Sequence, residues 1–450
     1  MHRLHNPVRP YAWGSTWHIP RLAGLPVADE PAAEMWFGAH PSAPSRTSDD
    51  IGLDQLILDA PERCLGTTVL DTFGPRLPFL MKLLAAAEPL SLQVHPTSER
   101  AQQRFREQNA AGVPPDAAER SYPDASHKPE LVFALTRFEG MAGFRDVAKT
   151  AQILRMLQLP WLDRVADRLD ASSAPSQTLR EVVTDLLAQS GHGLRTRLQE
   201  LLLAAVSAQA RFQRPTLRVR PPEVDPSSIE RESLRVFAQT AELVNRYPDD
   251  PGVLVTLFLN HVVLAAGEAM FIAAGTMHAY TSGFAVEVMA ASDNVLRAGL
   301  TPKHVDKAEL LDITDFTPMP PPRFPAEQLG GLDCVLLAPP VEEFELVVAT
   351  AAPGDSLPSA AGPAIVLCLA GEVTVGTGDV AQQLTPGEAV FVEAADGPAT
   401  VTGDGRAAVV RAPVAGGPSG SATRRSGGLA APARGQTLGA QSRPSGPSSP

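Results

Sequence analysis

The chain has 450 residues, of which 44% are hydrophobic and 20% charged, and its formal net charge is −12. This composition supplies enough apolar material for two or three buried cores, while a nucleic-acid surface would need clustered Lys and Arg. No run approaches the roughly 18 apolar residues that span a bilayer, and the N-terminus lacks the apolar core of a secretory signal. We therefore expect a cytoplasmic globular protein with no membrane or nucleic-acid partner.

The three cysteines, Cys64, Cys334 and Cys368, are scattered and have no CxxC spacing. This pattern favours buried thiols over disulfides or a thiolate metal site. Any metal is therefore expected on nitrogen and oxygen ligands.

The first part of the chain, residues 1–146, indicates short strands, turns and small helices. The run 77–87 is apolar except for Lys82. In the run 90–96 the residues alternate, so that Ser91, Gln93 and His95 project from one face of a strand. The residues that follow, 98–108, predict an exposed helix capped by Thr97 or Ser98.

A change of composition over residues 147–250 predicts a helical insert. Apolar residues recur at helical spacing in four segments separated by Pro, Ser and Gly breaks, namely 151–159, 179–189, 194–212 and 228–247. A turn at 249–252 ends the insert, and residues 253–264 return to apolar, β-rich sequence. The insert thus interrupts a β domain whose remainder is residues 251–325.

An internal repeat indicates two related β modules. Leu264–Ile272 (LAAGEAMFI) aligns with Leu384–Val392 (LTPGEAVFV), with a glycine at the turn of each copy. Short strands joined by such a turn resemble the cupin (jelly-roll) pattern. We therefore predict a mainly β protein with two cupin-like jelly-roll modules plus an α-helical domain. The second module spans 326–412, and the Gly-, Ser- and Pro-rich residues 413–450 are expected to be a disordered tail.

The two copies differ in chemistry. His278 follows the first copy, whereas the same offset after the second copy falls at Pro398, and residues 332–411 contain no histidine. We therefore expect the second module to be structural and non-catalytic.

The stretch 278–303 combines a histidine, a tyrosine, two carboxylates, an arginine and a lysine with small and apolar residues. His278 follows a glycine-containing turn after a strand, so we expect it at the rim of a pocket. Residues 284–290 alternate as a strand with one polar-capable face. This stretch is interpreted as the wall of a site.

Four candidate metal ligands come from three places in the chain: Gln93, His95, Glu130 and His278. Two imidazoles, a carboxylate and an amide oxygen suit Zn²⁺ and leave room for water or substrate. His127, which is close in sequence to Glu130, is a competing ligand that spacing leaves open.

Four motifs resemble those of the type I mannose-6-phosphate isomerases. The stretch HAYTSGFAVEVMAASDNVLRAGLTPK (278–303) is similar to the long signature of that family, and YPDASHKPE (122–130) is similar to its second motif. LQVHP (92–96) and YAWGS (11–15) resemble two more. One departure is visible, because the family usually has Asn where this chain has Ser126.

The resemblance implies an isomerase that interconverts D-mannose 6-phosphate and D-fructose 6-phosphate with one Zn²⁺ per chain, and we expect a monomer. It selects Glu130 over His127 as the carboxylate ligand, beside Gln93, His95 and His278. It also matches Arg297 to the active-site arginine of the family.

The implied reaction passes through a cis-enediolate, which requires a base near carbon and positive charge near two oxygens. Arg297 stays protonated, so its expected role is to stabilise the enediolate. Glu287, Lys128 or a metal-bound water remain as candidates for the proton carrier. For the substrate and its 6-phosphate we predict contacts from Ser91, Lys82, Lys303, Tyr280 and Asp293.

Two alternatives stay open on sequence alone. One is a non-catalytic sugar-phosphate sensor on the same scaffold, and the other is a metal-dependent cupin that acts on a different sugar. The chain has no glycine-rich P-loop and no nucleotidyltransferase-like glycine-rich N-terminus, which argues against a bifunctional isomerase and guanylyltransferase.

Overall fold

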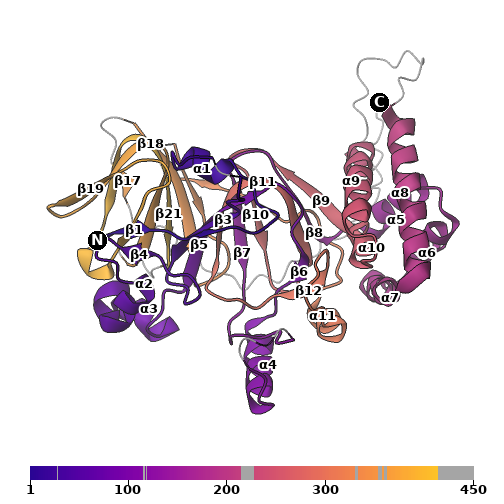
Figure 1. The fold of residues 1–450 in the computed structure, drawn as a ribbon, viewed down its shortest axis with the longest axis horizontal. Coiled ribbons are helices and arrows are strands. Elements are labelled where there is room, and N and C mark those ends of the chain that lie inside the picture. Colours follow the sequence, from indigo (N-terminus) through magenta and orange to yellow (C-terminus); the bar gives the residue numbers. More distant parts are fainter. Residues whose placement is uncertain are drawn as a thin grey trace, which may run out of the picture.

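A computed structural model of the chain describes residues 1–27, 29–114, 117, 119–213, 228–329, 333–352, 357–358 and 362–413. The predicted tail therefore lies outside the described residues, apart from Pro413. Two antiparallel sheets occupy most of the molecule and a group of helices lies at one end (Figure 1). The prediction of a mainly β fold with a helical insert is confirmed. Among the described residues, no helix combines the length and apolar character needed to cross a membrane.

The first sheet has 11 strands and carries the predicted site. Its main path runs β13-β10-β7-β11-β5-β3-β2, and β6, β8, β9 and β12 attach beside β11. The bounds are β2 (Val8–Arg9), β3 (Glu34–Gly38), β5 (Phe79–Ala86), β6 (Leu92–Val94), β7 (Glu130–Ala134), β8 (Phe138–Phe144), β9 (Leu259–Leu264), β10 (Ala269–Ile272), β11 (His278–Ala290), β12 (Leu296–Gly299) and β13 (Arg323–Phe324).

The second sheet has 10 strands and is not built from residues 326–412 alone. Two N-terminal strands join it, because β1 pairs with β20 and β4 pairs with β1. The bounds are β1 (His2–His5), β4 (Arg46–Thr47), β14 (Glu327–Gln328), β15 (Cys334–Leu337), β16 (Glu345–Ala351), β17 (Leu357–Pro358), β18 (Ala364–Thr377), β19 (Val380–Leu384), β20 (Ala389–Val392) and β21 (Thr400–Arg411). The N-terminal strands and the C-terminal module are therefore folded together.

One apolar core joins the two sheets. It contains Leu83 and Phe133 of the first sheet together with Leu346, Ile365 and Phe391 of the second, all of them buried. Burial of such side chains contributes roughly 1.5–3 kcal/mol each. The second sheet therefore supports the outer face of the sheet that carries the site.

The described part of the insert, residues 147–213 and 228–250, contains five helices, one more than predicted. They are α5 (Val147–Met156), α6 (Pro160–Asp170), α7 (Pro175–Leu187), α8 (Gly191–Gln213) and α9 (Ser228–Arg246). The missed helix is α6, because a proline such as Pro160 indicates a break, although proline is favoured in the first turn of a helix. The β-rich prediction for 253–264 is also partly wrong, since α10 (Gly252–Thr256) precedes β9.

The remaining helices lie outside the insert: α1 (His18–Leu22), α2 (Leu53–Asp59), α3 (Pro61–Phe73), α4 (Ser98–Ala110), α11 (Lys307–Ile313) and the 3₁₀ turn η1 (Ala394–Asp396). The predicted cap of α4 is confirmed, because the Thr97 side chain accepts a hydrogen bond from the Arg100 backbone N–H. Figure 1 shows α4 projecting from the edge of the first sheet.

The internal repeat corresponds to the same turn in both sheets. Gly267 and Gly387 have φ of 91° and 87°, a region that favours glycine. The Glu268 carboxylate accepts from the Ala265 backbone N–H at 2.7 Å, and Glu388 accepts from Thr385 N–H at 2.8 Å. The repeat therefore predicted a real structural equivalence.

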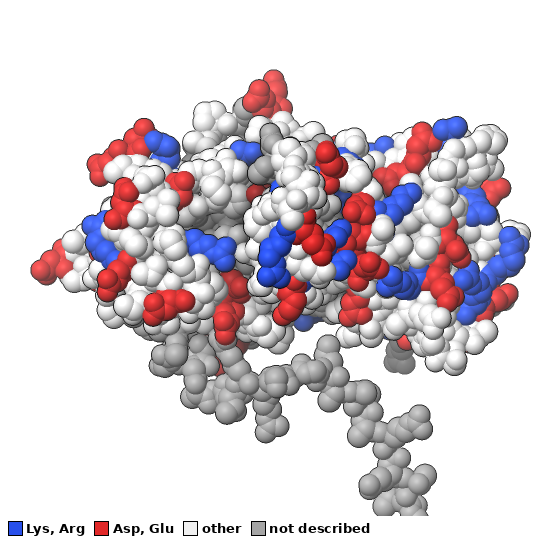
Figure 2. Space-filling model, turned by 90° about the horizontal axis from the view of Figure 1, so that it is seen from below, with Lys and Arg blue, Asp and Glu red and all other residues white. Residues whose placement is uncertain are grey.

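Charged side chains of both signs are interspersed on the face seen in Figure 2. Many form ion pairs, such as Arg155 with Asp167 and Asp170 on the insert. Cys64, Cys334 and Cys368 are free and buried, as their spacing predicted.

Candidate active site

Alternation along three neighbouring strands places charged residues on one face of the first sheet. In β5, β7 and β11 every second residue packs into the core shared by the two sheets, for example Leu83, Phe133 and Val286. Lys82, Glu130 and Glu287 occupy the intervening positions, which point to the opposite face. The ladder pairs Lys82 directly with Glu287, so their side chains are neighbours.

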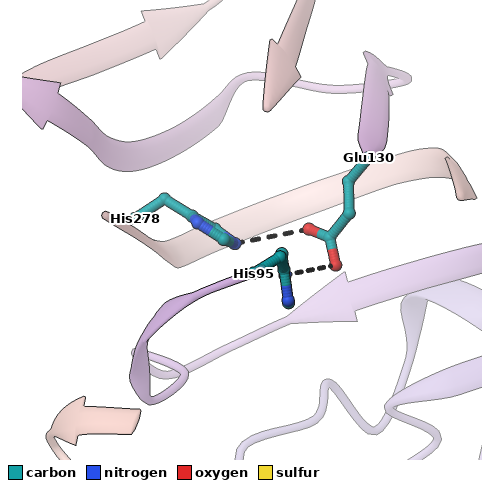
Figure 3. Close-up of side chains that lie close together, drawn as sticks. All are labelled: His95, Glu130 and His278. Atoms are coloured by element: carbon teal, nitrogen blue, oxygen red, sulfur yellow. Dashed lines mark ion pairs between the residues drawn. The ribbon is translucent and has the colours of Figure 1, made fainter. Parts of the chain in front are cut away.

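The side chains of His95, Glu130 and His278 point toward one another and form a buried cluster (Figure 3). His95 Nε2 lies 3.0 Å from Glu130 Oε1, and His278 Nε2 lies 3.3 Å from Glu130 Oε2. One ligating atom from each residue lies within 4.8 Å of the others. Gln93 is paired with His278 in the β6–β11 ladder. His278 is fully buried, so its predicted position at a pocket rim is wrong.

The hydrogen bonds of the two histidines show that this cluster fits a cation. His95 Nδ1 lies 2.8 Å from the Asn294 carbonyl oxygen, and His278 Nδ1 lies 2.9 Å from the Thr276 carbonyl oxygen. Because a carbonyl only accepts, each Nδ1 carries a proton, which leaves each Nε2, the atom that faces the Glu130 carboxylate, as the ring nitrogen available to a metal. Neither Nε2 has a hydrogen-bond partner among the described residues. Acceptors facing one another in a buried site are stabilised by a metal ion between them.

Ionisation supports the same arrangement. Burial lowers the pKa of His95 to about 4, although the Glu130 carboxylate acts in the opposite direction. The pKa of Glu130 lies well below its ordinary value because Lys128 and His95 outweigh the effect of burial. Two imidazoles and a carboxylate form a donor set that divalent zinc accepts when no thiolate is present.

The competing ligand His127 points elsewhere. Its Nε2 lies 2.6 Å from Glu343 Oε1, in the segment that precedes β16. It therefore belongs to a contact between the two sheets rather than to the metal cluster.

A hydrogen-bonded loop network orients His95. The carbonyl of Asn294 faces His95, while its side-chain amide donates to the carbonyl oxygens of Asp124 (2.9 Å) and Ser126 (2.7 Å). The Ser126 hydroxyl instead accepts from Arg76 at 3.1 Å. The network thus uses the backbone of residue 126, so the serine side chain is not needed to hold Asn294.

The two candidate proton carriers lie in different charge environments. Lys128 Nζ is 2.9 Å from Glu130 Oε1, so this lysine contacts a metal-ligand carboxylate. Glu287 is 3.4 Å from Lys82 Nζ, and burial raises the pKa of Glu287 to about 7. A carboxyl with a pKa near neutrality can both accept and return a proton.

Lys82 and Tyr280 are more constrained than the sequence suggested. Lys82 Nζ lies 3.5 Å from Glu34 and 3.4 Å from Glu287, and these carboxylates raise the pKa of Lys82 although burial acts to lower it. The Tyr280 hydroxyl donates to Glu130 Oε2 at 2.8 Å. Lys82 therefore has its charge matched within the protein, and Tyr280 holds a ligand carboxylate in place.

A pocket of about 770 Å³ opens above the cluster and gathers the predicted residues. Its lining includes every predicted catalytic and substrate-binding side chain as well as Gln93 and Glu130. Arg297 and Lys303 have no ion-pair partner among the described residues, and burial lowers the pKa of both, with Arg297 also lowering that of Lys303. One end of the pocket therefore carries positive charge that a substrate anion can match.

Sequence reasoning missed several lining residues. Glu34 and Trp36 come from β3, and the Lys82 ammonium lies 5.0 Å from the Trp36 ring centroid. Arg246 and Tyr247 come from the end of the helical insert, and Arg246 pairs with Glu88. Nothing in their local spacing signals a shared pocket, because the fold brings them there from distant segments.

Asp250 holds the strand that carries Arg297. Its carboxylate accepts from the backbone N–H groups of Gly252 at 2.8 Å and Leu300 at 2.6 Å. Leu300 has φ of 57°, which is strained for a branched side chain. A Cβ at Gly299 would lie 2.5 Å from the Asp250 carboxylate, so this approach requires glycine. The end of the insert thus fixes the turn that follows Arg297.

The fold and the site together define a mainly β protein with a buried cluster of two histidines and one carboxylate that could hold a metal ion at the floor of a polar pocket. Residues 1–147 match the family model "Phosphomannose isomerase type I, catalytic domain". The mannose-6-phosphate isomerase of Escherichia coli K12 is 38% identical over 421 residues, which cover 91% of this chain and 99% of that protein. The chain belongs to the type I mannose-6-phosphate isomerase family.

More distant relatives and solved structures agree. The mannose-6-phosphate isomerase of Aspergillus fumigatus is 32% identical and the match covers 87% of this chain and 91% of that protein. A zinc-bound crystal structure of a mannose 6-phosphate isomerase superposes with a TM-score of 0.78 at 33% identity, covering 92% of this chain and 99% of that one. A phosphomannose isomerase variant from Salmonella typhimurium has a TM-score of 0.79 at 34% identity, with coverage of 92% and 100%.

Proposed function

We propose that the chain interconverts D-mannose 6-phosphate and D-fructose 6-phosphate with one Zn²⁺ held by Gln93, His95, Glu130 and His278. The interconversion is the reaction of the family to which the chain belongs. The observation that carries the proposal is the pair of buried Nε2 atoms that face the Glu130 carboxylate without a hydrogen bond. This arrangement fits a cation at the floor of a pocket that also contains Arg297 and Lys303, neither of which has an ion-pair partner among the described residues.

When bound, Zn²⁺ supplies positive charge for the two substrate oxygens that become an enediolate. Arg297 extends that charge from the neighbouring strand, since it is paired with Gln93 in the β6–β12 ladder. Tyr280 and Lys128 hold the Glu130 carboxylate from two sides and fix its orientation.

We assign proton transfer between C1 and C2 to the buried pair formed by Glu287 and Lys128 with Lys82 beside them. Glu287 has the pKa nearest to neutrality among the carboxylates of the pocket, and Lys82 compensates its charge once it has given up its proton. A pH profile of kcat/KM for wild type and Glu287→Gln distinguishes the two carriers. Loss of the limb near neutral pH in Glu287→Gln, with a large fall in kcat, would assign the role to Glu287, whereas an unchanged limb would exclude it.

The 6-phosphate is placed at the positively charged end of the pocket. Lys303 lacks an ion-pair partner among the described residues there, and Ser91, which directly precedes β6, adds a hydroxyl donor. Lys82 is a weaker candidate for a phosphate contact than the sequence suggested, because Glu34 and Glu287 already match its charge. Asp293, whose Oδ2 lies 3.3 Å from His40 Nε2, is proposed to accept hydrogen bonds from the sugar hydroxyls.

A coupled isomerase assay tests this function. Activity on mannose 6-phosphate should disappear after chelation and return when Zn²⁺ is added back. A folded, zinc-loaded protein that binds the sugar phosphate without turning it over would instead be a sensor.

We further propose that the protein acts as a cytoplasmic monomer, since one chain supplies every side chain of the pocket. Light scattering during size-exclusion chromatography at the assay concentration tests the monomer. A dimer that dissociates with loss of activity would contradict it.

A further inference from the structure

A second polar cleft lies beside β11, on the opposite side from the active-site pocket. Thr281 and Ser282 line it, whereas the preceding residue, Tyr280, lines the active-site pocket. The β8–β11 ladder shifts register between Tyr280 and Ser282, so Thr281 is a bulged residue. The cleft has a volume of about 340 Å³ and its other walls are α9, β8 and β9. The two cavities share no lining residue.

Arg235 of α9 brings a positive charge to this cleft without a carboxylate partner. It is half-buried and forms no ion pair with the described residues, and its Nε is buried without a hydrogen-bond partner among them. The nearest carboxylates are engaged by other arginines, Glu232 with Arg145 at 2.7 Å and Glu139 with Arg137 at 2.7 Å. Partial burial of a guanidinium without a carboxylate partner is unfavourable, and this burial lowers the pKa of Arg235. An anion from solution would match this charge.

His261 of β9 supplies a second unsatisfied atom in the same cleft. Its Nε2 is buried and has no hydrogen-bond partner among the described residues. Burial and the guanidinium groups of Arg145 and Arg235 hold the pKa of His261 well below its ordinary value, although a backbone hydrogen bond to Thr256 acts in the opposite direction. The ring is therefore neutral, and it offers a hydrogen bond to a hydroxyl group rather than charge to an anion.

The rest of the lining restricts the charge of a ligand. Thr281, Ser282 and Gln239 provide neutral hydrogen-bonding groups. Glu242 also lines the cleft, and burial raises its pKa, which shows that negative charge is unfavourable at this position. A second anionic group of the ligand close to Glu242 is therefore disfavoured. The cleft thus fits one anionic group next to Arg235 and a hydroxyl next to His261.

We propose that this cleft is a second ligand site, which binds a small hydroxylated anion through Arg235 and His261. A hydroxycarboxylate and a hydroxyalkyl phosphate share this chemistry. The site is separate from the isomerase pocket, although Glu242 and Arg246, one turn apart on α9, line one cavity each.

Calorimetric titration of the zinc-loaded protein tests the proposal with malate and glycerol 3-phosphate as separate probes. The variants are Arg235→Gln, Arg235→Lys and, as a matched control, Arg164→Gln, which removes an exposed arginine from α6 of the same insert. Isomerase activity and circular dichroism check that each variant is folded.

We expect wild type and Arg164→Gln to bind one probe molecule in addition to any molecule in the isomerase pocket. Arg235→Gln should weaken this additional binding roughly 10- to 100-fold, as for loss of a charged hydrogen bond, and Arg235→Lys should lie between them. Tighter binding of malate would indicate a hydroxycarboxylate as the ligand, and tighter binding of glycerol 3-phosphate would indicate a hydroxyalkyl phosphate. No additional binding of either probe to wild type, or equal additional binding to Arg235→Gln, would overturn the proposal.

Discussion

The two copies of the internal repeat show how one strand arrangement serves two purposes. In the first sheet Ile272 is paired with Glu130, and in the second sheet the equivalent Val392 is paired with Ala364. The turns match in glycine conformation and in glutamate capping. The difference between an active site and a structural module therefore lies in the side chains that the strands present.

The residues around Glu130 and around Ala364 differ in the same way, charged in the first sheet and apolar in the second. The face with Glu130 also carries Lys82 and Glu287, whereas the interior of the second module is an apolar cluster that includes Val366, Val373 and Val390. Buried charges are tolerated in the first module because each has a partner or a metal to bind. The interior cluster of the second module is held by apolar packing, and its buried pair of Glu345 with Arg411 lies outside that cluster.

The substitution Glu130→Ala should have the largest effect on zinc binding and activity. It gives the first module the residue that the second module has at the equivalent position, Ala364. Glu130→Ala removes the carboxylate between two imidazoles and leaves Lys128 without its partner. We expect loss of zinc, loss of activity by roughly 10³-fold or more, and metal-free destabilisation of about 3–5 kcal/mol. Metal analysis, kinetics and urea unfolding measure these effects.

Glu345→Ala is the control, because it removes a buried carboxylate that pairs with Arg411 in the second module. This variant should lose stability but keep its zinc. Zinc loss from Glu345→Ala, or zinc retention by Glu130→Ala, would contradict the assignment of zinc to the first module.

Arg297→Ala tests the charge of the pocket. Arg297 has no ion-pair partner among the described residues, so its removal should barely affect folding. Loss of a preorganised charge typically lowers the rate about 10²- to 10³-fold. Steady-state kinetics should show this fall with zinc content unchanged, and Arg297→Lys should be intermediate. Turnover within a few-fold of wild type would refute the assigned role.

Acid should destabilise the metal-free protein through the first module. His95 has a pKa of about 4 in the folded state, below its unfolded value near 6.5, so the unfolded state binds more protons between these values. Stability is therefore lost as pH falls from about 6.5 to 4, by up to roughly 3 kcal/mol. Urea unfolding of the chelated protein at several pH values measures the slope. An equal slope in His95→Gln would assign the effect to other groups.

The smallest effect concerns Asp250, which supports the site from the insert. Asp250→Ala removes two charged hydrogen bonds, one of which holds Leu300 in its unfavourable backbone conformation with φ of 57°. We expect a loss of about 2 kcal/mol in unfolding free energy and roughly tenfold in kcat/KM, with zinc retained. Adding Leu300→Gly should restore part of the stability, because glycine tolerates this φ. No restoration would mean that strain at Leu300 is unimportant.

Local pattern was sufficient for the parts of the site that lie on single strands. Alternation grouped Ser91, Gln93 and His95, although the strand β6 is shorter than predicted and covers only Leu92–Val94, and the repeat alone located the two equivalent turns. The family resemblance selected Glu130, and its place in the cluster agrees with that selection.

Pairings between distant segments could not be predicted in this way. No local pattern shows that β1 joins the sheet of β20, or that Arg246 reaches the pocket from the insert. The ion pairs of Lys82 with Glu34 and Glu287 also depend on the order of strands in the sheet. That order is set by tertiary packing, which has no signature in a single segment.

The central claim is that one zinc ion binds in the first module and none in the second. Anomalous diffraction from crystals of the purified protein, recorded on both sides of the zinc absorption edge, tests it directly. We predict a single strong peak bounded by His95, Glu130 and His278, with Gln93 beside it. A peak elsewhere, or a folded and active protein with no zinc at this position, would contradict the account.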